Sequence, residues 1–186
     1  MTAESPVTDV ERYGGGHITI CDYDPTWPAE FEQERTRLQT ALGSIVTTIE
    51  HVGSTAVPGL AAKPIIDVLV GVRDLTEARV RCIEELGVLG YRYMAEYEAW
   101  LPGEMLFRKG NPGPWTHHAH VMEPSSPRWD ELIVVRDYLR THSDVATAYG
   151  ELKKALALVF QDDIAGFRDA KRPFLQALMA KARTES

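Results

Sequence analysis

Residues 51–67 read His-Val-Gly-Ser-Thr-Ala-Val-Pro-Gly-Leu-Ala-Ala-Lys-Pro-Ile-Ile-Asp. The small residues Gly53, Ser54 and Thr55 form a turn in which backbone N–H groups can approach an anion closely. Asp67 follows in an apolar run, where burying a carboxylate is costly unless a cation pairs with it. A Gly-Ser turn followed by one acid on an apolar strand therefore predicts a phosphate held near a metal ion.

The turn lies between two predicted strands. Residues 45–51 are rich in β-branched types, and residues 64–72 form a nearly continuous apolar run that is typical of a strand buried on both faces. Further strands are expected at residues 17–22, 91–95, 104–108 and 116–122. Strands and helices alternate in this part of the chain, which predicts an α+β domain with a small mixed sheet and packed helices.

Helix boundaries are indicated by capping residues. Asp24 and Pro25 are expected as N-cap and first residue of a helix that ends near residue 42, and Asp74 with Glu77 resembles a capping box for a helix to about residue 86. After Ser126 the periodicity becomes helical, and two more helices are expected from about residues 144 and 163. The C-terminal part of the chain is therefore predicted to be helical.

Composition limits the class of protein. The chain has 186 residues, of which 44% are hydrophobic and 25% charged, as in one globular domain that buries a full core. Residues 1–16, which end in three glycines, are expected to be a flexible leader to a single domain over residues 17–186. The formal net charge of -7 argues against nucleic acid as a partner, because such binding depends on neutralising phosphates.

The cysteines and the hydropathy pattern bear on location. Cys21 and Cys82 are far apart, which fits neither a zinc knuckle nor a disulfide framework and indicates a reducing compartment. No apolar run approaches the length of a membrane span, and the N-terminal residues lack the pattern of a signal peptide. A cytoplasmic protein without a membrane partner is therefore expected.

Several segments resemble the GrpB family, namely residues 20–28, 49–67, 107–110, 117–121 and 136–140. The resemblance covers about residues 17–180 and implies the nucleotidyltransferase fold of the DNA polymerase beta-like superfamily. In that superfamily a Gly-Ser or Gly-Gly pair precedes an Asp, an apolar residue and a second acid. Gly53, Ser54 and Asp67 match this motif, with twelve residues between Ser54 and Asp67.

One position departs from the motif. Side chains alternate along a strand, so residues 67 and 69 face the same way, and two carboxylates there would share a metal ion. Residue 69 is Leu, and a lone Asp67 is a poor scaffold for two-metal chemistry. Either the second ligand comes from elsewhere in the chain, or the site binds without the usual chemistry. The candidates for the ligand are two histidines and three acids: His118, His120, Glu98, Glu104 and Glu123.

The two histidines affect the choice of metal. His118 and His120 are two residues apart on a predicted strand, so their side chains share one face. The superfamily implies Mg²⁺ or Mn²⁺, but imidazole favours zinc, manganese or iron over magnesium. A divalent metal held by Asp67, His118 and His120 is therefore expected, with Mn²⁺ or Zn²⁺ favoured if the histidines bind it.

Simpler interpretations of these residues stay open at this point. The Gly-Ser pair can be an ordinary turn, and the two histidines can be strand residues bonded to backbone carbonyls. Asp67 can cap a helix or pair with Lys63 or Arg108 as a buried ion pair. His51 can be a residue at the end of a strand rather than a nucleotide contact.

The resemblance implies an enzyme that moves a nucleotidyl group from a nucleoside triphosphate to a small acceptor. Ser54, with the backbone of Gly53 and Thr55, would hold the phosphates, and a metal on Asp67 would polarise the α-phosphate. The metal shell would be completed by a histidine, and His120 is also a candidate to take the proton of the acceptor.

Basic residues near the motif are the remaining site candidates. Lys63, Arg108 and Lys109 are expected to offset the charge of the triphosphate, and His51 is a candidate nucleotide contact. The alternative function is a non-catalytic nucleotide-binding or chaperone-like module linked to coenzyme A, because a GrpB-like region is attached to dephospho-CoA kinase in some family members.

Overall fold

The computed structural model describes residues 17–110 and 114–185, so the expected leader at residues 1–16 lies outside the described residues. Within these ranges the chain forms five strands, five α-helices and three short 3-10 helices. In chain order they are α2 (Trp27–Leu42), η1 (Gly43–Ile45), β1 (Val46–Val52), η2 (Ser54–Ala56), β2 (Ile66–Val72), α3 (Leu75–Val88), β3 (Tyr91–Tyr93), η3 (Ala95–Tyr97), β4 (Glu104–Lys109), β5 (His117–Met122), α4 (Pro127–Thr141), α5 (Ser143–Phe160) and α6 (Ile164–Glu185).

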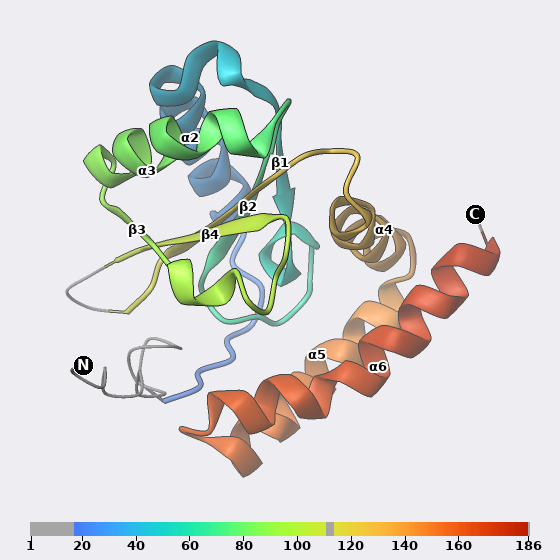
Figure 1. Ribbon diagram of the computed structural model, residues 1–186. Helices are drawn as coiled ribbons and strands as arrows, with labels where there is room; N and C mark the ends of the chain where they lie inside the picture. The colour runs from blue at the N-terminus through green and yellow to red at the C-terminus, as the bar shows by residue number, and fades with distance from the viewer. Residues whose placement is uncertain (1–16, 111–113, 186) are drawn as a thin grey trace, which may run out of the picture.

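The strands form one mixed sheet in the order β1-β2-β5-β4-β3 (Figure 1). The central pair β2 and β5 is parallel, and the other neighbours are antiparallel. The expected α+β class with a small mixed sheet and packed helices is thus confirmed. None of the described helices combines the length and the apolar character needed to cross a membrane.

Two predicted elements differ near the start of the described chain. The strand expected at residues 17–22 is wrong, because only Cys21 pairs there, through an isolated bridge to Ala62. Helix α2 begins at Trp27 rather than Pro25, since the Asp24 carboxylate accepts a hydrogen bond from the backbone N–H of Thr26 at 2.8 Å. Asp24 therefore closes a short turn before the helix and does not cap it.

The caps of the later helices agree with the sequence. Asp74 accepts a hydrogen bond from the backbone N–H of Glu77 at the start of α3, and Ser126 accepts one from Trp129 at the start of α4. Each side chain satisfies a backbone donor that a helix leaves free in its first turn.

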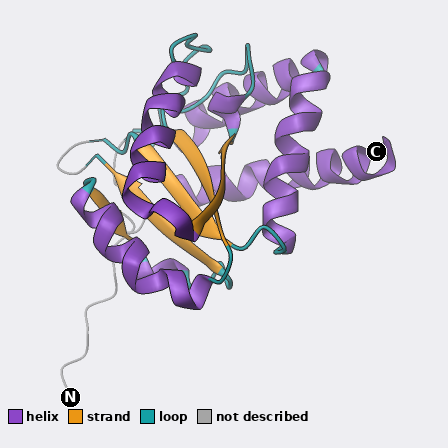
Figure 2. Ribbon diagram, turned by 90° about the horizontal axis from the view of Figure 1, so that it is seen from above, coloured by secondary structure: helices purple, strands orange, loops and turns teal. Residues whose placement is uncertain are grey.

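The two faces of the sheet have different compositions because side chains alternate along each strand. One face carries apolar residues such as Val70, Phe107 and Val121, and these pack in the main core with residues of α2 and α3. Figure 2 shows α2 and α3 lying across the sheet, with the remaining helices gathered to one side of it. Residues one position away in the strands, among them Asp67 and His118, point to the opposite face.

The C-terminal helices bring distant residues to this second face. Trp129 of α4 packs against Leu69 and Met122 of the sheet. Helices α5 and α6 run side by side in Figure 1, and the rings of Tyr149 and Phe174 stack between them with centroids 5.0 Å apart. The polar face of the sheet is therefore covered by helices that supply the second half of the site.

Lys109, a candidate phosphate ligand, has a different partner in the fold. Its ammonium group lies 2.8 Å from a carboxylate oxygen of Glu34, whose side chain is only 1% exposed. Arg37 reaches the other oxygen of Glu34 at 3.2 Å from an exposed position. Lys109 thus neutralises a buried acid on α2 and fixes that helix to strand β4.

We expect Lys109→Met to lower the free energy of unfolding by about 3 kcal/mol, because it leaves the buried Glu34 carboxylate without the lysine that neutralises it. Arg37→Met is the matched control and should cost less than about 1 kcal/mol, since exposed pairs contribute little. Urea unfolding of the two variants measures both values. Equal losses would contradict the structural role of Lys109.

Candidate active site

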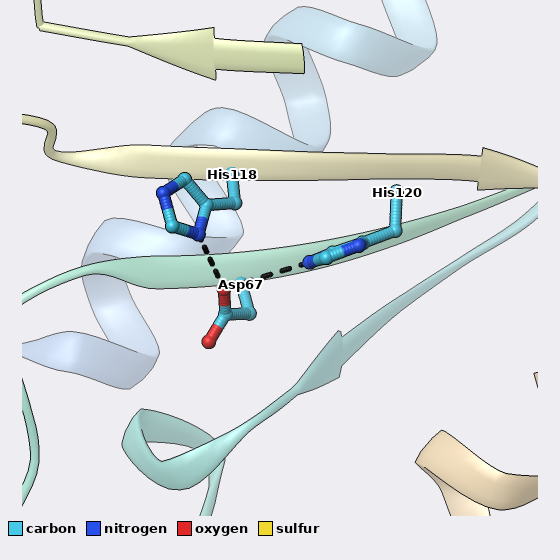
Figure 3. Close-up of side chains that lie close together, drawn as sticks. All are labelled: Asp67, His118 and His120. Atoms are coloured by element: carbon cyan, nitrogen blue, oxygen red, sulfur yellow. Dashed lines mark hydrogen bonds and ion pairs between the residues drawn. The ribbon is translucent and has the colours of Figure 1, made fainter. Parts of the chain in front are cut away.

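Three side chains converge on the polar face of the sheet at its parallel centre. Asp67 of β2 pairs in register with His118 of β5, and Leu69 pairs with His120. The Asp67 Oδ1 atom lies 3.1 Å from His118 Nδ1 and 3.6 Å from His120 Nε2 (Figure 3). The histidine on the neighbouring strand therefore occupies the position beside Leu69, where the motif would have placed a second acid.

A second carboxylate orients His120 from behind. Glu104 of β4 is 4% exposed, and its Oε1 atom lies 2.5 Å from His120 Nδ1. Arg128 approaches the other oxygen of Glu104 at 3.8 Å. If a metal ion replaced the proton on Nε2, the Nδ1 proton would stay bonded to Glu104 and Nε2 would offer its lone pair to the metal, which is the carboxylate–histidine arrangement found behind metal ligands.

The electrostatics of the cluster stabilise a positive charge between the carboxylates. Burial raises the pKa of Asp67, but hydrogen bonds from His118 and His120 outweigh it and hold this pKa well below its ordinary value. Burial lowers the pKa of His120, whereas Glu104 and Asp67 raise it more, to about 9. Burial lowers the pKa of His118. A cation at this point, whether a proton or a metal ion, is what the two acids favour.

The donor set fits a divalent metal. Ligand atoms of Asp67, His118 and His120 all lie within 4.8 Å of one another. Two imidazoles with one carboxylate are a set that catalytic zinc sites use, and manganese and iron also accept it. The Nε2 atom of His118 is buried and has no hydrogen-bond partner among the described residues.

The Gly-Ser turn packs directly on Asp67. Gly53 has a φ of 71°, and a Cβ atom added there would overlap the Oδ2 atom of Asp67. Only glycine accepts both this backbone conformation and this approach. Ser54 follows at the start of η2, and Lys153 of α5 donates a hydrogen bond to its Oγ atom at 2.7 Å.

These groups line one pocket of about 290 Å³ between the sheet, the turn and helices α5 and α6. Asp67 and His118 lie on one side of it, with Ser54 and Thr55 beside them. The lining also includes five basic residues, which are Lys63, Arg108, Lys153, Arg168 and Lys171. The pocket is therefore strongly cationic in a protein whose formal net charge is -7.

Three of the five cations have no neutralising acid. Among the residues that the structure describes, no carboxylate lies within ion-pair distance of Lys63, Lys153 or Lys171. Lys63 and Lys171 instead lie over the ring of Phe167, at 5.2 and 4.7 Å from its centroid. Burial, reinforced by the neighbouring lysine in each case, lowers the pKa of Lys153 to about 7 and that of Lys171 to about 8. Such a cluster favours a multiply charged anion.

The pocket contains several residues that the sequence singles out. Ser54, Thr55, Lys63, Asp67, Arg108 and His118 line it, and His120 lies against Asp67. The open ion-pair interpretation of Asp67 gives way to its contacts with the histidines. Of the three candidate acids, only Glu104 joins the cluster, since Glu98 pairs with Arg79 and Glu123 accepts a hydrogen bond from the backbone of Leu75.

Two predicted site residues lie outside the pocket lining. His51 is 7% exposed, stacks on Phe31 with centroids 4.6 Å apart, and lies 3.0 Å from the hydroxyl of Thr55. Burial lowers the pKa of His51 to about 4, so it supports the turn as a neutral ring. Lys109 is held by Glu34.

Three basic residues of the pocket are not singled out by sequence reasoning, and Lys153 carries a signal that could have found it. The buried positions of α5 are Ala146, Tyr149, Gly150, Lys153 and Ala157, which follow helical spacing. A lysine on the buried stripe of an otherwise apolar helix face indicates a functional role. Lys171 and Arg168 on α6 carry no comparable signal.

The fold and site define an α+β protein in which three side chains that could hold a metal ion lie beside a cationic pocket. The chain belongs to the GrpB protein family, whose model matches residues 17–181. It is similar to a solved structure of conserved protein GrpB from Enterococcus faecalis, with 35% identity, a TM-score of 0.82 and coverage of 90% of this chain and 98% of that one.

Curated relatives extend the comparison. A UPF0157 protein, YqkA of Bacillus subtilis, is 34% identical over 89% of this chain, which spans 47% of the length of that relative. A dephospho-CoA kinase of Mycolicibacterium paratuberculosis is 28% identical to this chain, and the match covers 89% of this chain and 46% of the kinase. Regions similar to this chain thus also occur within longer proteins.

We expect Glu104→Gln to weaken binding of Mn²⁺ and Zn²⁺ by about 10-fold or more, because losing the charge behind His120 makes its Nε2 a poorer ligand. Glu98→Gln, which changes an acid outside the cluster, is the matched control and should bind as the unaltered protein does. Calorimetric titration with each metal measures the affinities. Equal affinity in Glu104→Gln and the unaltered protein would contradict the supporting role of Glu104.

The same titration tests the choice of metal. With two imidazole ligands, Zn²⁺ and Mn²⁺ should bind more tightly than Mg²⁺. Asp67→Asn should weaken all three. Binding of Mg²⁺ alone would show that the histidines are not ligands.

Proposed function

We propose that the chain is a metal-dependent nucleotidyltransferase, which moves a nucleotidyl group from a nucleoside triphosphate to a small acceptor with release of pyrophosphate. The observation that carries this proposal is that Asp67 and His118, with His120 against Asp67, share one pocket with three lysines. None of these lysines forms an ion pair with an acid among the residues that the structure describes. A metal site alone suits many reactions, but a metal beside unneutralised cations favours a phosphate ester.

The basic residues divide the work of binding the triphosphate. Lys63 and Lys171 both lie over the ring of Phe167. They would neutralise the outer phosphates of the nucleoside triphosphate. Arg108 stacks on the ring of Tyr97, with its guanidinium carbon 4.9 Å from the ring centroid. This contact fixes a third cation in the same pocket. The backbone of the Gly53 turn and the Ser54 hydroxyl supply uncharged donors to a phosphate.

The reaction joins the acceptor to the α-phosphorus and breaks the bond to the bridging oxygen of pyrophosphate. A divalent ion bound by the triad would polarise the α-phosphate and stabilise the charge that develops on it. Asp67, His118 and His120 would hold the ion beside the pocket, and the lysines would stabilise the departing pyrophosphate. Leu69 is buried in an apolar cluster with Val52 and Met122 and offers no ligand atom. In this proposal the histidines therefore take the role of the second acid.

Transfer can be measured with mass detection by mixing the protein, Mn²⁺ and each nucleoside triphosphate with pooled hydroxyl and amine acceptors. We expect products and pyrophosphate with the unaltered protein and a loss of at least about 100-fold in Asp67→Asn, because that variant removes the charged ligand. If the unaltered protein transferred the nucleotidyl group no faster than Asp67→Asn does, the enzymatic proposal would be contradicted.

The similarity to a dephospho-CoA kinase favours a second candidate, a non-catalytic module that binds a nucleotide or a coenzyme A precursor. Both ligands carry phosphates on an adenosine, so the same cationic pocket suits either. Thermal stabilisation by adenosine triphosphate or dephospho-CoA, without any product in the transfer assay, would favour this module over the transferase.

The affinity for a polyanion should depend on pH through Lys171. Its pKa of about 8 is below the ordinary lysine value, so its charge is present at pH 7 and is lost as pH rises through 8. We expect binding of inorganic tripolyphosphate without metal to weaken between pH 7 and 9, measured by calorimetry. Lys171→Met should bind more weakly and lose most of this dependence above pH 7.5, whereas Lys181→Met on the exposed face of α6 should keep it. An unchanged pH profile in Lys171→Met would place the anion elsewhere.

A further inference from the structure

Ser54 and Lys153 form a close polar pair that phosphate binding alone does not explain. The Lys153 Nζ atom lies 2.7 Å from the Oγ atom of Ser54, although the two residues are 99 positions apart in the chain. The lysine is only 3% exposed, and its amine points at the Ser54 hydroxyl rather than into solvent. A lysine that serves only as a counter-ion gains more by keeping its ammonium group hydrated.

The surroundings of Lys153 favour its neutral form. The side chain is buried and Lys171 of α6 faces it as a like charge, whereas Asp67 of β2 and the ring of Tyr149, 4.5 Å from its Nζ atom, favour the charged form. No carboxylate of the described residues forms an ion pair with it. Burial and Lys171 lower the pKa of Lys153 to about 7, so a large fraction of the amine is unprotonated at neutral pH.

Ser54 is placed where a phosphorus atom would be bound. It lines the pocket with Asp67, and its neighbour Gly53 packs against the Oδ2 atom of that carboxylate. Ser54 is also the first residue of η2, which follows the turn. The hydroxyl therefore contacts a candidate base and shares a pocket with the candidate metal site. A serine bonded to a lysine is the arrangement found in serine nucleophiles that lysine activates.

We propose that Ser54 is a nucleophile and Lys153 its general base, so that the pocket forms a covalent phosphoester on Ser54. For its natural substrate this proposal rests on the proposed function, since a nucleoside triphosphate would supply the phosphorus. The Ser54 Oγ atom forms a bond to phosphorus, its proton passes to Nζ of Lys153, and pyrophosphate leaves with the electron pair of the broken P–O bond. The acceptor then attacks the same phosphorus and loses its proton to solvent, while the Oγ atom of Ser54 leaves and takes back the proton held by Nζ of Lys153.

The uncharged probe diisopropyl fluorophosphate tests the pair without metal or nucleotide. The Oγ atom of Ser54 displaces fluoride from phosphorus, and the proton passes to Lys153. We expect peptide mapping by mass spectrometry to find the diisopropyl phosphoryl group on Ser54. The labelling rate should rise with pH through about 7, because the lysine must be neutral to act as a base.

Four variants separate the base from a counter-ion. Ser54→Ala should lose the label at residue 54. Lys153→Met and Lys153→Arg should both slow labelling by about 100-fold or more, the usual contribution of a general base, and the arginine keeps the positive charge. Lys154→Met is the matched control, because Lys154 is the next residue on α5 and pairs with Asp22 and Glu151 instead. Near-ultraviolet circular dichroism confirms that each variant is folded.

Absence of label on Ser54 in the unaltered protein would overturn the proposal, as would labelling of folded Lys153→Arg at the unaltered rate. The nucleotide assay separates it from the proposed function. Nucleotidyl transfer at the full rate by Ser54→Ala would overturn the covalent step and leave the transferase standing. Labelling of Ser54 in a protein without transfer activity would keep the reactive pair and reject the transferase.

Discussion

The half-buried carboxylate of Asp67 is the constraint on which the arrangement of the polar half of the molecule depends. A charge in the centre of a sheet is unfavourable unless neighbouring groups compensate for it. His118 and His120 provide hydrogen bonds from the adjacent strand, and Gly53 lets the turn approach the remaining oxygen. The turn, the strand pairing and the histidines thus form one electrostatic unit rather than three separate features.

The sheet separates stability from chemistry by the alternation of its side chains. Ile66, Val68 and Val70 face the core beneath α2 and α3. Asp67, which lies between Ile66 and Val68 in the strand, faces the pocket on the other side. The apolar face supplies the burial that stabilises the fold. It thereby offsets the cost of a polar face with few apolar contacts, which is needed for ligands to enter.

Local patterns predict much of this structure, and long-range pairings account for what they miss. The caps at Asp74 and Ser126 depend on residues three positions away, so the sequence reveals them. The strand expected at residues 17–22 fails because a strand needs a partner, and only Cys21 finds one. Spacing predicts that His118 and His120 share a face. It does not reveal that Glu104 is the acid behind His120, because strand order decides that contact.

The direct contacts of Asp67 are imidazoles rather than a second acid, and this affects the charge that the site presents to the pocket. Glu104, the other acid of the cluster, lies behind His120 and is not part of the pocket lining. Lys63 and Lys171 add positive charge to the same pocket. A local positive potential of this kind can attract a polyanion even to a protein with a formal net charge of -7. With Leu69 in place of a second acid, Asp67 is the one acid among the pocket-lining residues that the structure describes, and it lies beside five basic residues.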